Sequence, residues 1–168
     1  QFLTWEMYED FAYGNGSKNY SIPLCGQLTY GRKKLPVNPY TLGAWLGGGE
    51  KSAPRITCGD VWVRDRVTQA YKTTDSVSDP SRFYIQGISK HLRDLEVLNN
   101  KHIPDEYLQG SESQRWELIQ GLMDTDGSCY KSGQCEFTSM GRPLADGVVE
   151  LLRSLGLKPT ITEKTARI

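Results

Sequence analysis

The sequence contains few cysteines, only two histidines and no long apolar run, and each shortage argues against a class of protein. Its four cysteines, Cys25, Cys58, Cys129 and Cys135, form no CxxC pair and have no histidine at metal-ligand spacing, which argues against a zinc site or a disulfide framework. We expect free thiols of a reducing compartment, although Cys129 and Cys135 can face each other across a hairpin. No signal peptide is visible and no apolar run approaches the length of a membrane span, so we expect a soluble, cytoplasmic protein.

The chain also lacks an excess of charge of either sign, with 20 lysines and arginines against 20 aspartates and glutamates. This balance argues against nucleic-acid binding driven by a net positive charge, because nucleic-acid-binding domains are usually basic. It leaves open a basic face on an otherwise balanced surface. The 168 residues, 38% of them hydrophobic, suit one globular domain with a sizeable core or two small halves that share one.

The rest of the chain is organised around residues 119–127, which have the sequence IQGLMDTDG. Apolar residues at helical spacing predict a helix that ends at the final glycine. Gly121 and Thr125 are small and lie four residues apart, on one face, where they let another helix backbone come close. The helix ends in two carboxylates, Asp124 and Asp126, although the helix dipole is already negative there, and a bound cation usually explains this arrangement.

The same pattern occurs a second time, in residues 41–49, which have the sequence TLGAWLGGG. The two stretches align without gaps, with Gly43 under Gly121 and a glycine at the end of each. Two such helices in a chain of this length predict a pseudo-twofold protein whose halves meet along the paired helices.

These stretches resemble the two motifs of a LAGLIDADG homing endonuclease, a family named for the sequence that the second motif nearly spells. Residues 21–24, 35–40, 101–104 and 151–157 resemble the surroundings of these motifs in endonuclease domains nested inside inteins. The resemblance covers roughly residues 20–168. It implies an α+β fold of two pseudo-twofold related αββαββ(α) halves, packed through the motif helices, each with a curved antiparallel sheet that forms a DNA-binding saddle.

The resemblance also divides the chain into domains. Residues 1–20 are expected to be an N-terminal arm or the tail of an intein splicing domain, separated from the rest by a turn at 14–17. Residues 21–110 form the first half. Residues 111–168 are expected to form the second, without its last strand, so that the remainder is either cut off or disordered, or the chain is one piece of a split protein.

Local patterns predict the elements in more detail. Helices are predicted at 60–71, 88–98, 111–124 and 142–155, and strands at 55–58, 73–77, 82–86, 128–130, 134–138 and 158–163. All four tryptophans, Trp5, Trp45, Trp62 and Trp116, are predicted to be core aromatics.

The family's chemistry implies phosphodiester hydrolysis assisted by Mg²⁺ or Mn²⁺, hard cations that prefer oxygen ligands at the ends of the two motif helices. By resemblance Asp126 is one ligand, assisted by the carbonyls of Gly127 and Gly49. Gly48 stands where the family places the second acid, so the site should lose about one full ligand charge. Glu50 is an alternative ligand, although moving a ligand by even ~1 Å can cost on the order of 10²-fold in rate.

Lys101 matches a lysine between the motifs that the family places near the active site. It can stabilise the pentavalent phosphate or polarise the attacking water. The alternative is a solvated lysine in a linker.

For DNA recognition, the family uses the exposed face of each curved sheet in the major groove. The candidates by alternation are Arg55, Thr57, Lys72, Arg82, Lys131, Gln134, Thr138 and Lys158, with Thr74 and Tyr84 beside them. Some of these residues are expected simply to face water.

The sequence therefore predicts a site-specific double-strand DNA homing endonuclease domain of an intein, inactive or impaired because of Gly48. Two alternatives stay open, a non-catalytic DNA-binding or regulatory domain of the same fold and an RNA-splicing maturase. The expected partners are a duplex DNA target, and intein splicing halves or a complementary C-terminal fragment. We expect a cytoplasmic, bacterial or phage-encoded monomer with an internal pseudo-twofold and no membrane contact.

Overall fold

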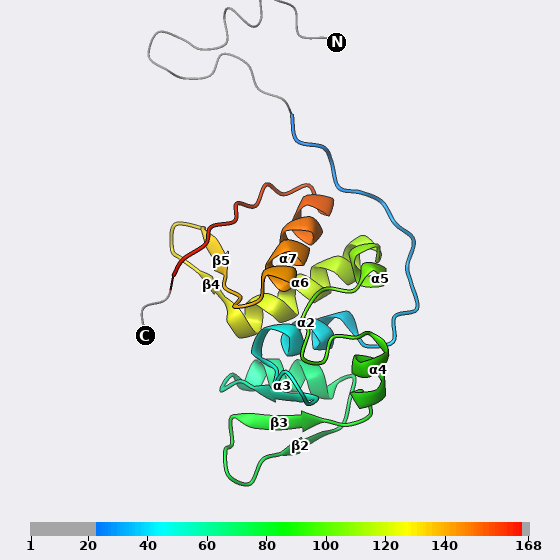
Figure 1. The fold of residues 1–168 in the computed structure, drawn as a ribbon, viewed down its shortest axis with the longest axis vertical. Helices are drawn as coiled ribbons and strands as arrows, with labels where there is room; N and C mark the ends of the chain where they lie inside the picture. The colour runs from blue at the N-terminus through cyan, green and yellow to red at the C-terminus, as the bar shows by residue number, and fades with distance from the viewer. Residues whose placement is uncertain (1–22, 166–168) are drawn as a thin grey trace, which may run out of the picture.

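The fold is described by a computed structural model, which covers residues 23–165 (Figure 1). The interpretation of residues 1–20 lies outside the described residues. In chain order the helices and strands are α2 (Pro39–Gly48), β1 (Arg55–Thr57), α3 (Val61–Thr68), β2 (Thr73–Asp75), β3 (Arg82–Ile85), α4 (Ser89–Asp94), α5 (Asp105–Leu108), α6 (Glu112–Asp126), β4 (Gly127–Cys129), β5 (Cys135–Phe137) and α7 (Arg142–Ser154). The described chain is α+β, with two small antiparallel sheets ordered β1-β3-β2 and β4-β5. No helix within residues 23–165 is long and apolar enough to cross a membrane.

Both motif sequences form helices, and local capping determines where each begins. Asn38 precedes α2, and its side chain accepts a hydrogen bond from the Thr41 N–H. α6 begins with a capping box, in which the side chains of Ser111 and Gln114 each accept a hydrogen bond from the other residue's backbone N–H. The predicted second motif helix is therefore confirmed.

α2 and α6 make the most extensive contact between elements of the described chain, and Figure 1 shows them packed at its centre. A Cβ added at Gly43 would overlap the carbonyl oxygen of Leu118, and one at Gly121 would overlap that of Tyr40. The prediction that small residues let the two motif helices approach closely is confirmed.

The first sheet has one buried face, because β3 lies between β1 and β2 and alternates along its length. Ile56, Phe83 and Ile85 are fully buried, and Ile56 lies directly opposite Phe83. Val63 and Val67 of α3 belong to the same core. The strands predicted in this half are confirmed, each over a shorter length.

Only one strand separates α2 from α3, because Asp60 starts the next helix directly after β1. Its side chain accepts a hydrogen bond from the Trp62 N–H at 2.8 Å. The first half of the described chain therefore has one strand fewer before its second helix than the resemblance implies. The helix predicted at 88–98 is shorter than expected, since the backbone turns to positive φ at Glu96 and Asn99.

The second sheet is the hairpin of β4 and β5, and α7 follows it as predicted. The predicted strand at 158–163 is wrong: this segment is mostly exposed and pairs with no strand of the described chain. Alternation alone does not make a strand, because the backbone N–H and C=O groups need the ladder of a neighbour.

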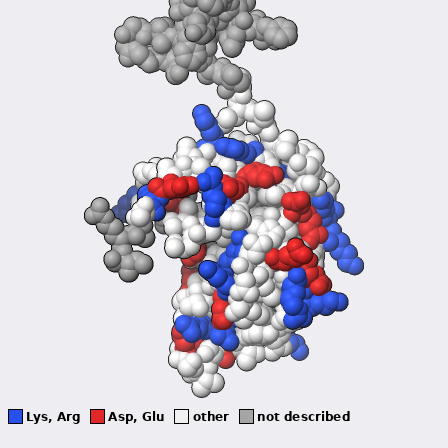
Figure 2. Space-filling view, viewed as in Figure 1, with Lys and Arg blue, Asp and Glu red and all other residues white. Residues whose placement is uncertain are grey.

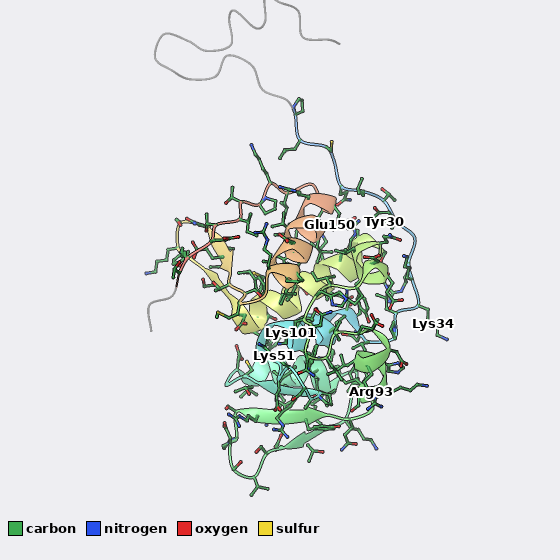
Figure 3. The ribbon with its side chains drawn as sticks, in the orientation of Figure 1. Tyr30, Lys34, Lys51, Arg93, Lys101 and Glu150 are labelled. Atoms are coloured by element: carbon green, nitrogen blue, oxygen red, sulfur yellow. A yellow bond between two sulfur atoms is a disulfide. The ribbon has the colours of Figure 1, made fainter. Side chains whose placement is uncertain are left out.

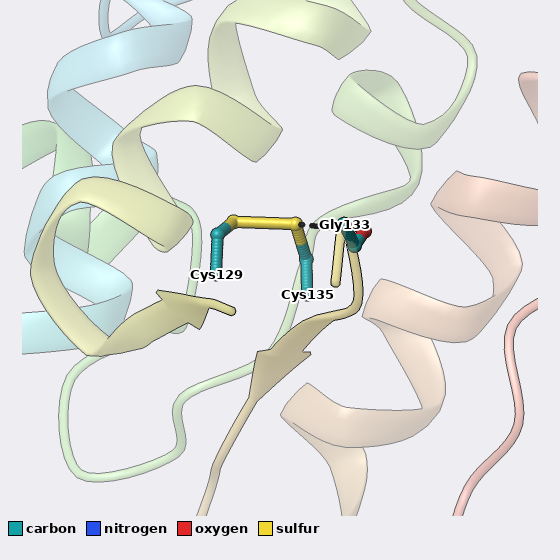
Figure 4. Close-up of a disulfide and its surroundings, with 3 residues drawn as sticks. All are labelled: Cys129, Gly133 and Cys135. Carbon is teal, nitrogen blue, oxygen red and sulfur yellow. Dashed lines mark hydrogen bonds between the residues drawn. A yellow bond between two sulfur atoms is a disulfide. The ribbon is translucent and has the colours of Figure 1, made fainter. Parts of the chain in front are cut away.

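The hairpin contains two of the four cysteines, and their state differs from the prediction. Cys129 and Cys135 are joined in a disulfide (Figure 4), so the prediction of free thiols is wrong for this pair. Their alternative placement, facing each other across a hairpin, is confirmed. Cys25 and Cys58 are free.

The tryptophans are divided between core and surface. Trp45 is fully buried, and its indole N–H donates a hydrogen bond to the Ala53 carbonyl at 2.8 Å. The prediction is wrong for Trp62, which is 63% exposed in the first turn of α3, and for Trp116, which is 36% exposed on the outer side of α6. Trp5 lies outside the described residues.

A buried arginine joins the second half to the segment before α2. Arg115 is completely buried, and its guanidinium donates to the carbonyls of Gly110, Leu28 and Ser154 and to the Ser154 hydroxyl. These acceptors lie just past α5, at the end of α7 and before α2. One side chain therefore satisfies backbone groups from three segments.

The short helix α5 was not predicted, and it carries a second buried link. The Tyr107 hydroxyl donates to the Val37 carbonyl at 2.8 Å and accepts from the Val37 N–H at 2.9 Å. Burial raises the pKa of Tyr107 above its ordinary value. This pair holds the segment that leads into α2.

Tyr107→Phe is expected to lower the free energy of unfolding by about 2 kcal/mol, because the buried N–H and C=O of Val37 both lose their partner. The raised pKa means that the folded chain keeps the phenol proton at pH values where the unfolded chain has lost it. The advantage of the wild type over the variant is therefore complete below about pH 10 and declines above it. Urea denaturation at pH 7 and above pH 10 measures both effects.

The matched control is Tyr84→Phe, which removes a partly exposed hydroxyl whose one hydrogen bond among the described residues is to Ser89. It should change stability by less than about 0.5 kcal/mol. Equal losses in the two variants, or a Tyr107 effect that stays constant above pH 10, would contradict the assignment.

Candidate active site and nucleic-acid interface

The carboxy-terminal ends of α2 and α6 lie against each other. α2 ends at Gly48 and α6 at Asp126, and Gly49 and Gly127 follow them as extended cap residues. A Cβ added at Gly48 would lie 3.2 Å from the Thr125 Cβ and 3.2 Å from the Thr57 carbonyl oxygen. The structure thus brings together the two motif ends that the sequence singles out.

Lys101 reaches the end of α2 from the linker that precedes α5. Its ammonium donates hydrogen bonds to the carbonyls of Leu46 at 2.9 Å, Gly47 at 3.2 Å and Gly49 at 2.7 Å, and it lies 5.2 Å from the centre of the Trp45 ring. Because these bonds hold the half-buried side chain, Lys101 is not merely a solvated linker lysine.

The electrostatic surroundings of Lys101 are mixed. Burial is the main cause that lowers its pKa to about 8; the charge of Asp126 opposes this shift, and the neighbouring Lys51 adds to it. Figure 3 labels Lys51 and Lys101 close together beside α2. The ammonium is therefore largely charged at neutral pH, close to the carboxylate that ends α6.

The donor atoms at the two helix ends differ in their fit to a divalent cation. Asp126 is exposed at the end of α6, and Mg²⁺ usually takes only one or two protein carboxylates, so this end suits an oxygen-ligated ion. The end of α2 offers no carboxylate, and the Gly49 carbonyl is already bonded to Lys101. Within residues 23–165 no three His, Cys, Asp or Glu residues come together as a metal-binding group.

Two other carboxylates near the motif ends have partners of their own. Glu50, the alternative ligand, accepts hydrogen bonds from Arg55 at 3.0 Å and from Ser52 at 3.3 Å. Asp124 accepts a hydrogen bond from the Tyr40 hydroxyl at 2.8 Å, and burial together with this bond raises the pKa of Tyr40. Asp124 thus contributes to the packing of α2 against α6.

The exposed face of the first sheet collects the candidate DNA contacts of the first half. Arg55 pairs with Tyr84 and Thr57 with Arg82, which places these side chains opposite the buried face. The Gln86 N–H donates to the Lys72 carbonyl, so the alternation continues past the ends of β2 and β3. The four predicted contacts in this half, Arg55, Thr57, Lys72 and Arg82, therefore lie on one face.

Sequence reasoning missed one member of this face. Gln86 follows Arg82 and Tyr84 at the same spacing of two, and its amide donates a hydrogen bond to the Thr74 hydroxyl at 2.8 Å. The same alternation of exposed and buried positions that selected Arg82 and Tyr84 would have been sufficient to predict Gln86.

The candidates of the second half are more scattered. Lys131 lies in the turn of the hairpin, Gln134 directly precedes β5 and Thr138 follows it. Lys158 is exposed beyond α7 and is not part of a strand. In Figure 2 lysines and arginines alternate with acids over the viewed face, so this view shows no uniform basic patch. The role of each candidate in DNA binding stays a prediction.

Comparison with known proteins identifies the class. Residues 113–168, which include most of α6 and all of β4, β5 and α7, match the LAGLIDADG-like domain. The chain is 38% identical over 149 residues to the replicative DNA helicase DnaB of Mycobacterium intracellulare. The aligned stretch is 89% of this chain and 24% of the helicase.

Two further relatives match shorter stretches. The homothallic switching endonuclease of Saccharomyces cerevisiae is 33% identical over 87 residues, which is 48% of this chain and 14% of the endonuclease. A DNA polymerase of Thermococcus hydrothermalis is 33% identical over 61 residues, which is 36% of this chain and 4% of the polymerase. The chain spans no more than about a quarter of any of these three relatives.

The structure thus has two closely packed helices with small contact residues, which end beside an exposed carboxylate and are followed by short antiparallel strands. The domain match and the similarity to the switching endonuclease support a LAGLIDADG homing endonuclease.

Proposed function

We propose that this chain is the DNA endonuclease domain of an intein, which binds one duplex site and hydrolyses its phosphodiester bonds poorly because Gly48 replaces an acid. The observation that carries the proposal is the meeting of the two motif ends, with Asp126 and Lys101 beside them. Asp126 supplies the oxygen ligand and Lys101 a positive charge next to it. When bound, Mg²⁺ or Mn²⁺ would stabilise the charge that develops on the phosphate.

The intein assignment rests on the relatives. A helicase, an endonuclease and a polymerase have different activities, yet each shares with this chain a stretch of 24%, 14% or 4% of its length. A domain inserted into unrelated hosts explains such matches better than a common helicase or polymerase activity. We therefore attribute the similarity to the inserted domain.

The proposed architecture is a monomer of two halves, residues 21–110 and 111–168, related by a pseudo-twofold axis along α2 and α6. The open face of β1, β2 and β3 and the outer face of the β4-β5 hairpin would then lie along the major groove on either side of the cleavage site. In this arrangement the sheets bind the DNA and the helix ends hold the scissile phosphates in place.

Gly48 favours a second function, a DNA-binding or regulatory domain that keeps the fold without cleavage. The bonds of Lys101 to the α2 carbonyls support it, because they already satisfy that end of the site with a positive charge. Both functions require specific binding to duplex DNA, and they differ only in hydrolysis.

Selection from a random library of DNA duplexes in EDTA is expected to recover one preferred site, bound with an affinity that falls steeply with salt. Arg82→Ala is expected to weaken binding to that site by roughly 1–3 kcal/mol if Arg82 contacts a base, or to reduce the salt slope by about 1 if it contacts a phosphate. Gel retardation of the selected duplex at several salt concentrations measures both quantities.

The matched control is Arg93→Ala, which removes an exposed arginine of α4 that is not among the predicted DNA contacts. It should leave affinity and salt slope unchanged. Failure to select any duplex, or binding that does not depend on salt, would refute the proposed function in both its forms.

A further inference from the structure

The hairpin of β4 and β5 carries a pair of cysteines in a position suited to reversible oxidation. Cys129 and Cys135 are directly opposite each other in the ladder, with their Cα atoms 4.1 Å apart. Both residues are exposed, so small thiols and disulfides in solution can reach them. Figure 4 shows the sulfur atoms bridging the two strands on one side of the hairpin.

Apart from the disulfide, the outer part of this hairpin is held by hydrogen bonds near the solvent, such as that from the Tyr130 N–H to the Gln134 carbonyl at 2.8 Å and that from the Tyr130 hydroxyl to Glu136 at 3.2 Å. Each strand has three residues, and no third strand of the described chain pairs with them. Phe137, at the base, packs against the core, but the residues from Cys129 to Cys135 are all exposed. A two-stranded hairpin of this size is marginal by itself in water, so the covalent link matters more here than in a larger sheet.

We propose that Cys129 and Cys135 form a redox switch that orders the hairpin when oxidised and loosens it when reduced. One cysteine thiolate attacks a small disulfide such as oxidised glutathione, which releases one glutathione thiolate and leaves a mixed disulfide. The second cysteine thiolate then attacks the protein sulfur of that mixed disulfide and releases the other glutathione. The two thiol protons pass to the released thiolates, and two electrons move from the cysteine pair to glutathione.

The switch would act on the second half of the DNA interface. Lys131 lies in the turn that the two cysteines close, and Gln134 is adjacent to Cys135. Oxidation fixes both side chains relative to α6, since β4 begins directly at the end of that helix. This consequence rests on the proposed function, whereas oxidation and ordering of the hairpin do not.

The test equilibrates the full chain in glutathione buffers of increasing oxidised fraction. Mass spectrometry of peptides cut without reduction is expected to show the Cys129–Cys135 link appearing in one two-electron step. Trypsin cuts after Lys131, and the rate at that bond, measured after quenching and reduction, is expected to be about tenfold lower in the oxidised chain. Cys129→Ser/Cys135→Ser should be cut at the rate of the reduced chain under every condition.

Absence of the linked peptide at every glutathione ratio, or equal cleavage rates in the oxidised and reduced chains, would overturn the switch. Neither of these two measurements uses DNA, so failure of the redox switch in them leaves the proposed function standing. Oxidation is further expected to raise the affinity for the selected duplex severalfold. An unchanged affinity in a chain that still binds DNA would overturn the effect on the interface alone.

Discussion

Gly121→Val is expected to abolish the folded state under ordinary conditions, with a loss of more than about 4 kcal/mol, because it separates the two central helices. A Cβ at this position would overlap the Tyr40 carbonyl oxygen and lie 2.6 Å from the Ala44 nitrogen. Both are backbone atoms of α2, so no side chain can turn away to make room. The loss is a large part of the roughly 5–15 kcal/mol that stabilises a typical domain.

The matched control for this prediction is Gln120→Val, one residue earlier on the same helix. Gln120 is exposed, and its side chain makes one long hydrogen bond of 3.5 Å to Arg66. Valine there should cost only about 0.5–1 kcal/mol, chiefly through its lower helix propensity. Circular dichroism during urea denaturation measures both variants. Similar stability in the two variants would show that α2 and α6 do not approach as closely as described.

Gly48→Asp is expected to raise Mg²⁺-dependent cleavage of a pooled duplex library by at least about 10²-fold, because it restores an oxygen ligand beside Asp126. The site is crowded, since the new Cβ would lie 3.2 Å from both the Thr125 Cβ and the Thr57 carbonyl oxygen. Thr125→Ala removes the Thr125 methyl group, which lies 3.5 Å from the same point. The double variant Gly48→Asp/Thr125→Ala should therefore cut at least as fast as the single one.

Gly48→Asn separates charge from shape in this experiment. Asparagine has nearly the same size as aspartate but no charge. The Gly48→Asn variant should therefore bind the selected duplex as Gly48→Asp does, but its cleavage rate should stay at the level of the unaltered chain. Asp126→Asn in the Gly48→Asp background should abolish the gain. If the unaltered chain cuts as fast as Gly48→Asp, Gly48 does not impair cleavage. If neither protein cuts but both bind DNA, the non-catalytic function is the correct one.

The parts of the fold that the sequence predicted are those with local or strictly periodic causes. The second motif helix follows from its apolar spacing, and the close pairing of the helices from Gly43 and Gly121. The open face of the first sheet follows from alternation, because side chains on a strand change sides at every residue. These causes lie within a few residues of each position.

The parts that the sequence did not predict depend on distant partners. The segment at 158–163 alternates well enough for a strand, but no neighbour completes it in the described chain. Trp62 has a large, mostly apolar side chain of the kind usually found in a core, yet it lies in the exposed first turn of α3. Lys101 could be placed near the motifs by resemblance, whereas its bonds to α2 carbonyls more than 50 positions away could not.

The buried guanidinium of Arg115 has a consequence for the path of the chain around the paired helices. It holds Leu28 and Ser154 at one point, and the Leu28 N–H also donates to the Ser154 carbonyl at 2.8 Å. The segment that leads into α2 and the end of α7 are therefore held together at this point. For the inserted domain proposed above, this contact keeps the chain ahead of the paired helices close to the chain behind α7, which favours tolerance of insertion into a host loop.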